Sequence, residues 1–275
     1  IGDIFELAEQ KDLALARRST AASDNHNHIR FSLPRLFLCA VFLIIPSLHA
    51  ENSLPAIFSD HMVLQADKPT AIWGRAMPKE KITVEFLGKS YPAQAGDDGR
   101  WSLKLDAAPK GGPHELIVRG AKEIRIHDVL VGEVWLCSGQ SNMEMQLRGS
   151  HGEVANADAE IAAANYPAIR MFQFNTTYSI FELPAPPDEP QSNREGRWVV
   201  CSPKTVTDFS AMGYFFGREI HKQVGGPVGL INSSAGGSGI EAWTSKEAQK
   251  AQPEIKPILD SWQTTLANYD PAAEM

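Results

Sequence analysis

The sequence has little of what metal or nucleic-acid chemistry requires. It contains three cysteines in 275 residues, and it has no C-x-x-C or H-E-x-x-H spacing that would hold a zinc ion. Its 26 Lys and Arg residues are outnumbered by 33 Asp and Glu residues, for a net charge of -7, and no basic run follows residue 50. Because phosphate groups are bound by clustered Lys and Arg, nucleic acid and an anionic membrane surface are excluded as expected partners. No metal site is expected.

Long apolar runs are also absent after residue 50, and the one before it predicts a leader. Arg30 and Arg35 precede LFLCAVFLIIPSLHA, which is too short to span a bilayer comfortably, is broken by Pro46 and ends at Ala50. We interpret residues 1–50 as a secretory signal preceded by an artefactual extension; a membrane anchor is the alternative. The mature chain is then expected to be exported, periplasmic or secreted, with no stable membrane span after signal removal.

Two cysteines, Cys137 and Cys201, lie outside the leader. In an exported chain they could form a disulfide. We favour two free buried thiols, because Cys137 ends an apolar run in which a small hydrophobic side chain packs well. The sequence leaves both alternatives open.

Residues 51–128 are expected to form a β-rich domain. Short runs of near period-two alternation are separated by turn residues: AIWGRA, KITVEFLG, WSLKLDAA, HELIVRG and EIRIHDV. About five or six strands at this spacing predict a small β-sandwich-like domain. Such a domain could bind carbohydrate, brace an enzyme or do neither.

From residue 129 the pattern changes to that of a layered α/β domain, expected over residues 129–275. VLVGEVWLC is a nearly continuous apolar run, typical of a parallel strand covered on both faces. Helical and extended segments then alternate in the order NADAEIAAANY, IRMFQF, FSAMGYFFGREIHKQV and PVGLIN, with Gly225 and Gly226 ending the second helix. This alternation implies right-handed crossovers and a parallel sheet.

Two loops rich in small residues follow predicted strands, CSGQSNM and NSSAGGSG. In open parallel sheets the ligand site lies outside the carboxyl ends of the strands. Ser141 would begin a helix there, with its Oγ close to backbone N–H groups that favour developing negative charge. Gly139 permits a tight turn, and Gly236 and Gly237 permit close approach of their N–H groups to a substrate oxygen. The alternative is that these are ordinary turn and N-cap residues.

Several segments, in order along the chain, resemble the SGNH hydrolase superfamily in its branch of sialate O-acetylesterases and related carbohydrate acetylesterases. They are IFSDHMVLQADKP, DDGRWSL, VLVGEVWLCSGQSNMEM, CSPKTVTDFSAMGYFFGREIH and GPVGLINSSAGGSGIEAWTS, and they cover most of residues 54–248. GQSNM is not the G-x-S-x-G elbow of α/β-hydrolases, since Met143 stands in place of the second glycine. The resemblance implies a flavodoxin-like three-layer α/β/α fold, incomplete here and preceded by the β-sandwich-like domain.

The resemblance also implies a Ser-His-Asp esterase that needs no cofactor. Ser141 matches the nucleophile, and its own N–H would help to form the oxyanion hole. Gly237 matches the glycine that donates a second N–H, with Gly236 beside it as a possible further donor. Gln140 and Asn142 follow the motif and are expected to shape the loop and contact the substrate.

Three other positions qualify the resemblance. Ala235 stands where the family commonly has a bulky aromatic residue, which would widen the pocket beside the glycines. Glu241 and Trp243 match family positions, although a helix start and simple packing explain them equally well.

The family's D-x-x-H, which supplies the acid and the base, does not occur in this chain. Among the histidines after residue 50, His151 is the one to watch, although a solvated loop histidine is the simpler reading. We therefore expect a C-terminally truncated protein whose 275-residue form lacks normal turnover.

These observations predict that the full-length protein is a serine esterase that removes O-acetyl groups from carbohydrate, with sialic acid as the first substrate. Acetylxylan or another polysaccharide is the alternative substrate. A non-catalytic carbohydrate-binding protein is the alternative from a different class, because the histidine and the aspartate are missing. The expected partner is an acetylated sugar or glycan, and the hydroxyl position and oligomeric state are left open.

Overall fold

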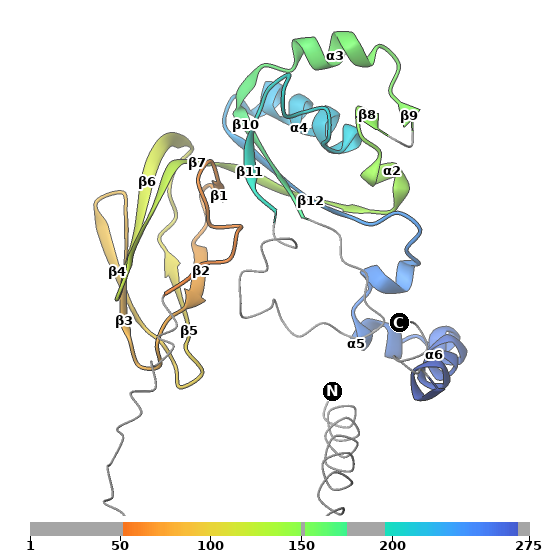
Figure 1. Ribbon diagram of the computed structural model, residues 1–275, viewed down its shortest axis with the longest axis horizontal. Coiled ribbons are helices and arrows are strands. Elements are labelled where there is room, and N and C mark those ends of the chain that lie inside the picture. Colours follow the sequence, from red (N-terminus) through yellow and green to blue (C-terminus); the bar gives the residue numbers. More distant parts are fainter. Residues whose placement is uncertain (1–51, 150–151, 175–195, 269–275) are drawn as a thin grey trace, which may run out of the picture. The chain divides into compact units, whose positions relative to one another are not determined.

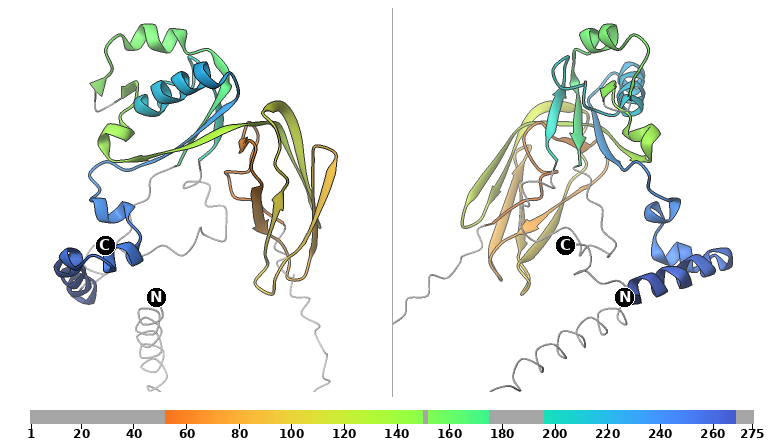
Figure 2. Two further views of the ribbon diagram at one scale, coloured as in Figure 1. Left: turned by 180° about the vertical axis from the view of Figure 1, so that it is seen from behind. Right: turned by 45° about the vertical axis from the view of Figure 1, so that its right-hand side comes forward.

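The computed structural model describes residues 52–149, 152–174 and 196–268, which all fall in one compact unit, Leu48–Met275 (Figures 1 and 2). The expected leader at residues 1–50 and His151 lie outside the described residues. Among the residues described, no helix combines the length and the apolar character that a bilayer crossing requires.

The β-rich part contains all the strands that the alternating runs predict, together with two that they miss. Its strands are β1 (Val63–Gln65), β2 (Thr70–Arg75), β3 (Lys81–Phe86), β4 (Lys89–Gln94), β5 (Arg100–Leu105) and β6 (Gly111–Arg119). The alternating runs predict neither β1, which is three residues long, nor β4, which carries Pro92. Proline removes a ladder donor and is confined to sheet edges. β4 lies at such an edge, paired only with β3 among the described strands.

One long strand, β7 (Glu123–Gly139), joins the two parts of the molecule. It pairs antiparallel with β6, parallel with β1 at residues 130–132, and parallel with β12 (Val228–Ser234) at residues 133–139. The segments EIRIHDV and VLVGEVWLC are therefore one element. The expected boundary between residues 128 and 129 falls inside this strand, and the division into two domains there stays a prediction.

The second part has the α/β architecture expected from the sequence. Its other elements are α2 (Ser141–Glu144), β8 (Arg148–Gly149), β9 (Gly152–Glu153), α3 (Ala157–Ala163), β10 (Tyr166–Gln173), β11 (Trp198–Cys201), α4 (Ala211–Val224), η1 (Ile240–Trp243), α5 (Lys246–Lys250), η2 (Pro253–Ile255) and α6 (Lys256–Asn268). The sheet order is β11-β10-β12-β7, in which β10, β12 and β7 are parallel. Helices α2, α3 and α4 lie on one side of this sheet in Figure 1, and α4 packs on β10 and β12.

Helix α4 begins and ends where its sequence indicates. The Ser210 Oγ accepts a hydrogen bond from the Gly213 N–H at 3.0 Å, and Gly225 ends the helix with a φ of 61°. Under α4 lies a buried cluster: Cys137, Leu147, Ala164, Ile169, Met171, Cys201, Val206, Phe209, Ala211, Tyr214, Val228 and Leu230. This core fixes α4 against the strands that lead to the two small-residue loops.

The expectation that VLVGEVWLC is covered on both faces is wrong for its second half. Trp135 and Leu136 are exposed, Leu136 to 66%. Beyond Gly132, β7 has left the β-rich part and pairs only with β12 among the described strands. The Trp135 ring meets Phe216 of α4 edge-on at 5.0 Å, whereas Leu136 points to the opposite face.

The core of the β-rich part extends into the α/β sheet. Phe172 of β10 and Trp198 of β11 belong to the same buried cluster as the β-rich side chains. The Trp198 Nε1–H donates to the carbonyl oxygen of Ile57 at 2.8 Å. The two parts therefore share buried apolar surface and do not merely touch.

A polar cluster ties the same two parts together. Asp128 of β7 accepts hydrogen bonds from Arg170 of β10 at 2.5 and 3.2 Å, and its carboxylate lies 2.6 Å from the His61 Nδ1. The side chain of Arg170 is only 6% exposed. Asp128 and His61 both adopt positive φ, of 55° and 69°. We call these three residues the Asp128 cluster.

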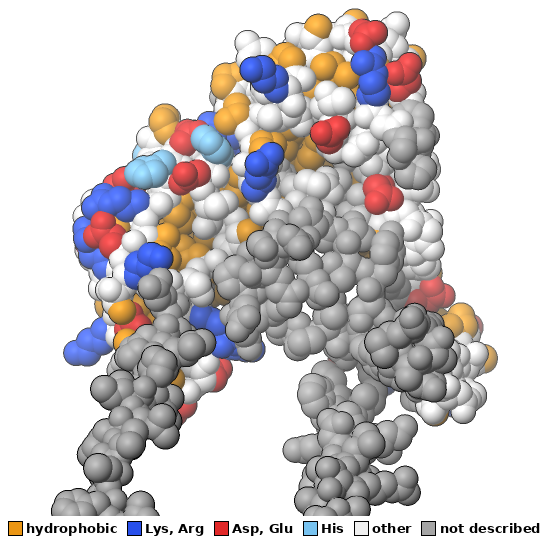
Figure 3. All heavy atoms as spheres, in the orientation of Figure 1, with side chains coloured by type: hydrophobic (Ala, Val, Ile, Leu, Met, Phe, Trp, Pro, Cys, Tyr) orange, Lys and Arg blue, Asp and Glu red, His pale blue; other side chains and the backbone are white. Residues whose placement is uncertain are grey.

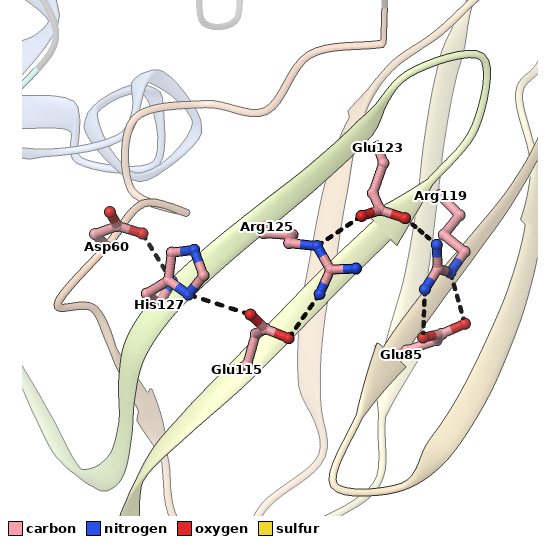
Figure 4. Close-up of polar contacts among 7 residues, drawn as sticks. All are labelled: Asp60, Glu85, Glu115, Arg119, Glu123, Arg125 and His127. Atoms are coloured by element: carbon pink, nitrogen blue, oxygen red, sulfur yellow. Dashed lines mark hydrogen bonds and ion pairs between the residues drawn. The ribbon is translucent and has the colours of Figure 1, made fainter.

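The outer face of β3, β6 and β7 carries a row of paired side chains, drawn in Figure 4: Glu85, Glu115, Arg119, Glu123, Arg125 and His127. Asp60, in the segment before β1, accepts a hydrogen bond from the backbone N–H of His127 at 2.7 Å. Acidic and basic side chains are also interspersed over the β-rich part in Figure 3. Exposed ion pairs each stabilise a fold only slightly. This row therefore keeps one face of the sheet solvated.

Candidate active site

Ser141 lies where β7 gives way to α2. Gln140 caps the helix in extended conformation, and its carbonyl oxygen accepts from the N–H groups of Met143 and Glu144 at 2.9 and 3.0 Å. The first N–H groups of a helix have no partner within it. Among the described residues, neither the N–H nor the Oγ of Ser141 has a hydrogen-bond partner, and Ser141 is exposed. The hydroxyl is thus accessible to a substrate.

The helix after Ser141 is a single turn. With four residues, α2 is too short for a large macrodipole, which requires many aligned peptide units. Electrostatic stabilisation of an oxyanion at Ser141 is therefore expected from individual backbone N–H groups and not from a helix dipole. This is the geometry that oxyanion holes use.

The second small-residue loop leaves the sheet beside the first. Parallel pairing aligns Ser233 with Ser138 and Ser234 with Gly139. The Ala235 N–H then donates to the Gly139 carbonyl at 2.9 Å, which joins the two loops directly. The structure therefore brings together the two segments that the sequence analysis selected.

Gly139 is required by its backbone conformation. Its φ of 147° lies in the region that favours glycine, and the strand turns there toward α2. Gly237 has a φ of 75°, for the same reason, where the second loop reverses.

Gly236 of the second loop lies beside Ser141. A Cβ placed on Gly236 would lie 3.7 Å from the Ser141 Cβ and only 2.4 Å from the Oε2 of Glu144. The Gly236 N–H donates to that carboxylate oxygen at 2.7 Å. It therefore already has a partner in this structure. For the Gly237 N–H, no partner is found within the described ranges.

Glu144 is a site residue that the sequence analysis missed. It stands three residues after Ser141 and therefore lies on the same side of the helical turn. The sequence offered that spacing as a signal, but the contact with the second loop depends on tertiary structure. The side chains of Gln140 and Asn142, on either side of Ser141, are exposed. Their expected roles in shaping the loop and contacting the substrate stay predictions.

Trp243 braces the second loop. Its Nε1–H donates to the Ser238 Oγ at 2.8 Å, and the Ser238 hydroxyl donates to the Ala235 carbonyl at 2.7 Å. The carbonyl of Glu241 accepts from the Gln249 side chain at 2.7 Å. The packing role considered for Trp243 thus includes a specific hydrogen bond to the glycine loop.

The two cysteines are free and buried, as favoured from the sequence. Burial raises the pKa of the Cys137 thiol to about 11 and that of Cys201 to about 12. Thiols of such pKa are almost entirely protonated at neutral pH and are poor nucleophiles. Ser141 therefore has no competing nucleophile in these two residues.

The histidines that the structure describes do not serve Ser141. Among the described histidine side chains, His61 contacts Asp128, which lies thirteen residues before Ser141, or on the order of 40 Å along an extended strand at about 3.3 Å per residue. His114 lies in β6 of the β-rich part, and the ring of His127 contacts Glu115 of β6. His221 Nδ1 lies 2.8 Å from the Gly226 carbonyl, ahead of the start of β12. Within the described ranges, no group of His, Cys, Asp and Glu side chains could hold a metal ion.

This chain is similar to known carbohydrate acetylesterases. The family model described as carbohydrate esterase, sialic acid-specific acetylesterase, matches residues 131–267. Sialate O-acetylesterase from Rattus norvegicus is 34% identical over 232 residues, and that from Homo sapiens is 32% identical over 211 residues. These alignments cover 72% and 70% of this chain but 41% and 39% of the relatives. The chain thus spans less than half the length of these relatives.

A solved structure is similar as well. A carbohydrate acetylesterase from Xanthomonas citri is 36% identical with a TM-score of 0.62, covering 74% of this chain and 45% of that chain. The chain is a sialate O-acetylesterase-like protein. In this sialate O-acetylesterase-like chain, the family match begins within β7 and includes both small-residue loops. The SGNH-like α/β fold expected from the sequence is confirmed.

Proposed function

We propose that the gene product in full is a serine esterase that removes O-acetyl groups from carbohydrate, and that its substrate is O-acetylated sialic acid. The observation that supports the proposal is the register of β7 and β12, with the exposed Ser141 after β7 and its Cβ beside Gly236 of the second loop. The names of the similar proteins support the acetyl-sugar substrate class.

The chemistry assigned to these residues is acyl transfer. The Ser141 Oγ attacks the acetyl carbonyl carbon while a base takes the hydroxyl proton, and the carbonyl oxygen becomes an oxyanion. The N–H groups of Ser141 and Gly237 stabilise that oxyanion. Collapse breaks the bond to the sugar oxygen, which takes the proton back from the base and leaves as the sugar hydroxyl. Acetyl-Ser141 remains, and water then hydrolyses it to acetate and free Ser141. The base is assigned to a histidine outside the described residues, because His61 is bound to Asp128, His114 and His127 lie in the β-rich part, and His221 lies beside Gly226.

The expected outcome for Ser141→Ala is loss of activity. Acetate release from O-acetyl sialic acid is measured for the full-length protein and for this variant. A fall of at least about 1,000-fold in kcat is expected, since triad serines contribute factors of this size or larger. Equal rates would remove the hydrolase proposal.

The substrate class has its own test. Initial rates on O-acetyl sialic acid and on acetylated xylan are compared at equal acetyl concentration. The proposal expects the sialic acid to react faster, whereas preference for xylan would reassign the enzyme to polysaccharide.

We also propose that the protein is exported, on the strength of the leader expected at residues 1–50. Cell fractionation checks this: the mature protein is expected outside the cytoplasm with a new N-terminus near Glu51. Retention of the leader in the membrane fraction would favour an anchor.

A further inference from the structure

We infer that Glu144 is a positioning residue of this site: its carboxylate holds the Gly236 N–H, so that the next peptide presents the Gly237 N–H to the oxyanion. The inference rests on the proposed esterase function and deepens it. It changes the expected role of Gly236, which becomes an anchor and not an oxyanion donor.

The contact is short and charge-assisted. The Gly236 N–H lies 2.7 Å from the Glu144 Oε2, within the range of strong hydrogen bonds to carboxylates. Glu144 ends the helical turn that Ser141 begins, so that the nucleophile and the loop anchor share one rigid element. A displacement of the loop relative to Ser141 therefore has to break this bond.

The absence of a side chain at Gly236 leaves room for the Glu144 carboxylate. Its φ is not in the left-handed region, so alanine is allowed by the backbone there. A Cβ would nevertheless meet the Glu144 Oε2 at 2.4 Å and displace it. Gly236→Ala is therefore expected to break the same contact from the opposite side.

Other contacts hold the rest of the loop. The Ala235 N–H is bound to Gly139, and the Ala235 carbonyl to Ser238, which in turn is bound to Trp243. Loss of the Glu144 contact is thus expected to release the peptides at Gly236 and Gly237 without unfolding the loop. Loss of this contact is expected to lower kcat more than it changes KM, because the oxyanion donor acts in the transition state.

The role depends on an acceptor oxygen and not on the negative charge. A carboxylate near a developing oxyanion is electrostatically unfavourable, so that charge itself cannot be the benefit. Glu144→Gln keeps an acceptor oxygen at the same reach. Glu144→Ala removes the acceptor, and Glu144→Asp shortens the side chain by one methylene.

The experiment measures kcat and KM for O-acetyl sialic acid with the full-length protein. Glu144→Ala and Glu144→Asp are expected to lose about 10- to 100-fold in kcat with KM nearly unchanged, as for a misplaced oxyanion donor. Glu144→Gln is expected to recover most of that loss. Glu153→Gln, which alters an exposed carboxylate of β9 paired with Arg148, is the matched control and is expected to have wild-type rates.

A double variant isolates the contact. Gly236→Ala is expected to lower kcat in the wild-type background and to have little further effect in Glu144→Ala, because both changes break one bond. Additive losses would overturn the inference. Amide hydrogen exchange at Gly236 in the 275-residue chain provides a readout independent of turnover and is expected to accelerate in Glu144→Ala but not in Glu144→Gln.

The outcomes separate this inference from the proposed function. If Glu144→Ala keeps kcat within about twofold of wild type while Ser141→Ala is inactive, the positioning role is overturned and the esterase stands. If Ser141→Ala keeps the wild-type rate, the proposed function fails and the inference falls with it.

Discussion

Cys137 lies four residues before Ser141, yet its side chain is buried whereas that of Ser141 is exposed. Cys137 faces α4, where a Cβ on Gly213 would lie 3.4 Å from its Sγ. Ser141 lies beyond the end of the sheet and is exposed. The strand β7 therefore buries the Cys137 thiol, whereas the turn after the strand exposes the Ser141 hydroxyl.

The burial of the thiols gives a direct prediction. With a pKa of about 11 for Cys137 and about 12 for Cys201, the thiolate fraction at pH 8 is on the order of one in a thousand or less. A disulfide reagent is expected to react with neither residue in the folded Cys39→Ser variant at pH 8, and with both after denaturation. Rapid reaction of either thiol in the folded protein would contradict their burial.

Among the elements, the Asp128 cluster couples β7, β10 and the segment before β1. Hydrogen bonds from Arg170 hold the pKa of Asp128 below its usual value, with the His61 contact acting in the same direction. A carboxyl whose pKa is lower in the folded state than in the unfolded state stabilises the fold at pH values above its unfolded-state pKa, which is about 4 for aspartate. That contribution is lost as the pH falls through the folded pKa.

Asp128→Asn tests the cluster. Asparagine accepts positive φ as aspartate does, so that the variant removes charge without straining the backbone. Leaving Arg170 buried without its carboxylate is expected to lower the free energy of unfolding at pH 7 by about 2–4 kcal/mol.

The pH dependence distinguishes this cluster from a surface pair. The difference in Tm between wild type and Asp128→Asn is expected to shrink below pH 4, as Asp128 becomes protonated in the wild type. Asp97→Asn, which alters a surface pair with Lys79, is the control and is expected to unfold as the wild type does. A gap for Asp128→Asn that stays constant down to pH 3 would argue against the ion pair.

The sequence predicts those strands and helix ends that are determined by local residue patterns. Period-two alternation located β2, β3 and β5, and the Gly225 stop ended α4 correctly. Pro92 concealed β4, because a proline within a run normally argues against a strand. The continuity of β7 was hidden, since an alternating half and an apolar half look like two elements.

The proximity of the two small-residue loops was predictable in the same way. Small residues after two strands selected Ser141, Gly236 and Gly237, because strand ends in an α/β sheet converge at one edge, and the pairing of β7 with β12 does bring these loops together. The catalytic roles of the three residues stay predictions. The Glu144 contact was not predictable, since it joins residues 92 positions apart along the chain. Tertiary structure alone decides which glycine N–H is already occupied.

At the scale of the whole molecule, β7 and the shared core make the β-rich part and the α/β part mutually dependent. The indole of Trp198 enters the core of the β-rich part from β11. The described region is therefore expected to unfold in one cooperative transition.

Trp198→Ala should destabilise both parts together. Removing a buried tryptophan is expected to cost about 3–5 kcal/mol, because the cavity and the lost hydrogen bond both contribute. Far-UV circular dichroism and tryptophan fluorescence are expected to report the same lowered midpoint. Trp262→Ala, on the exposed face of α6, is the control and should have little effect. Two separate transitions would show that the parts are independent domains.

The ladder between β7 and β12 also limits which sequence changes this strand can tolerate. Side chains of a strand alternate between faces, so that one inserted or deleted residue between positions 133 and 139 would send Cys137 outward and bring Leu136 under α4. It would also shift the turn that carries Ser141 by one residue relative to β12. Substitutions at the exposed Leu136 can be absorbed, whereas changes of length in this short stretch are expected to be purged by selection.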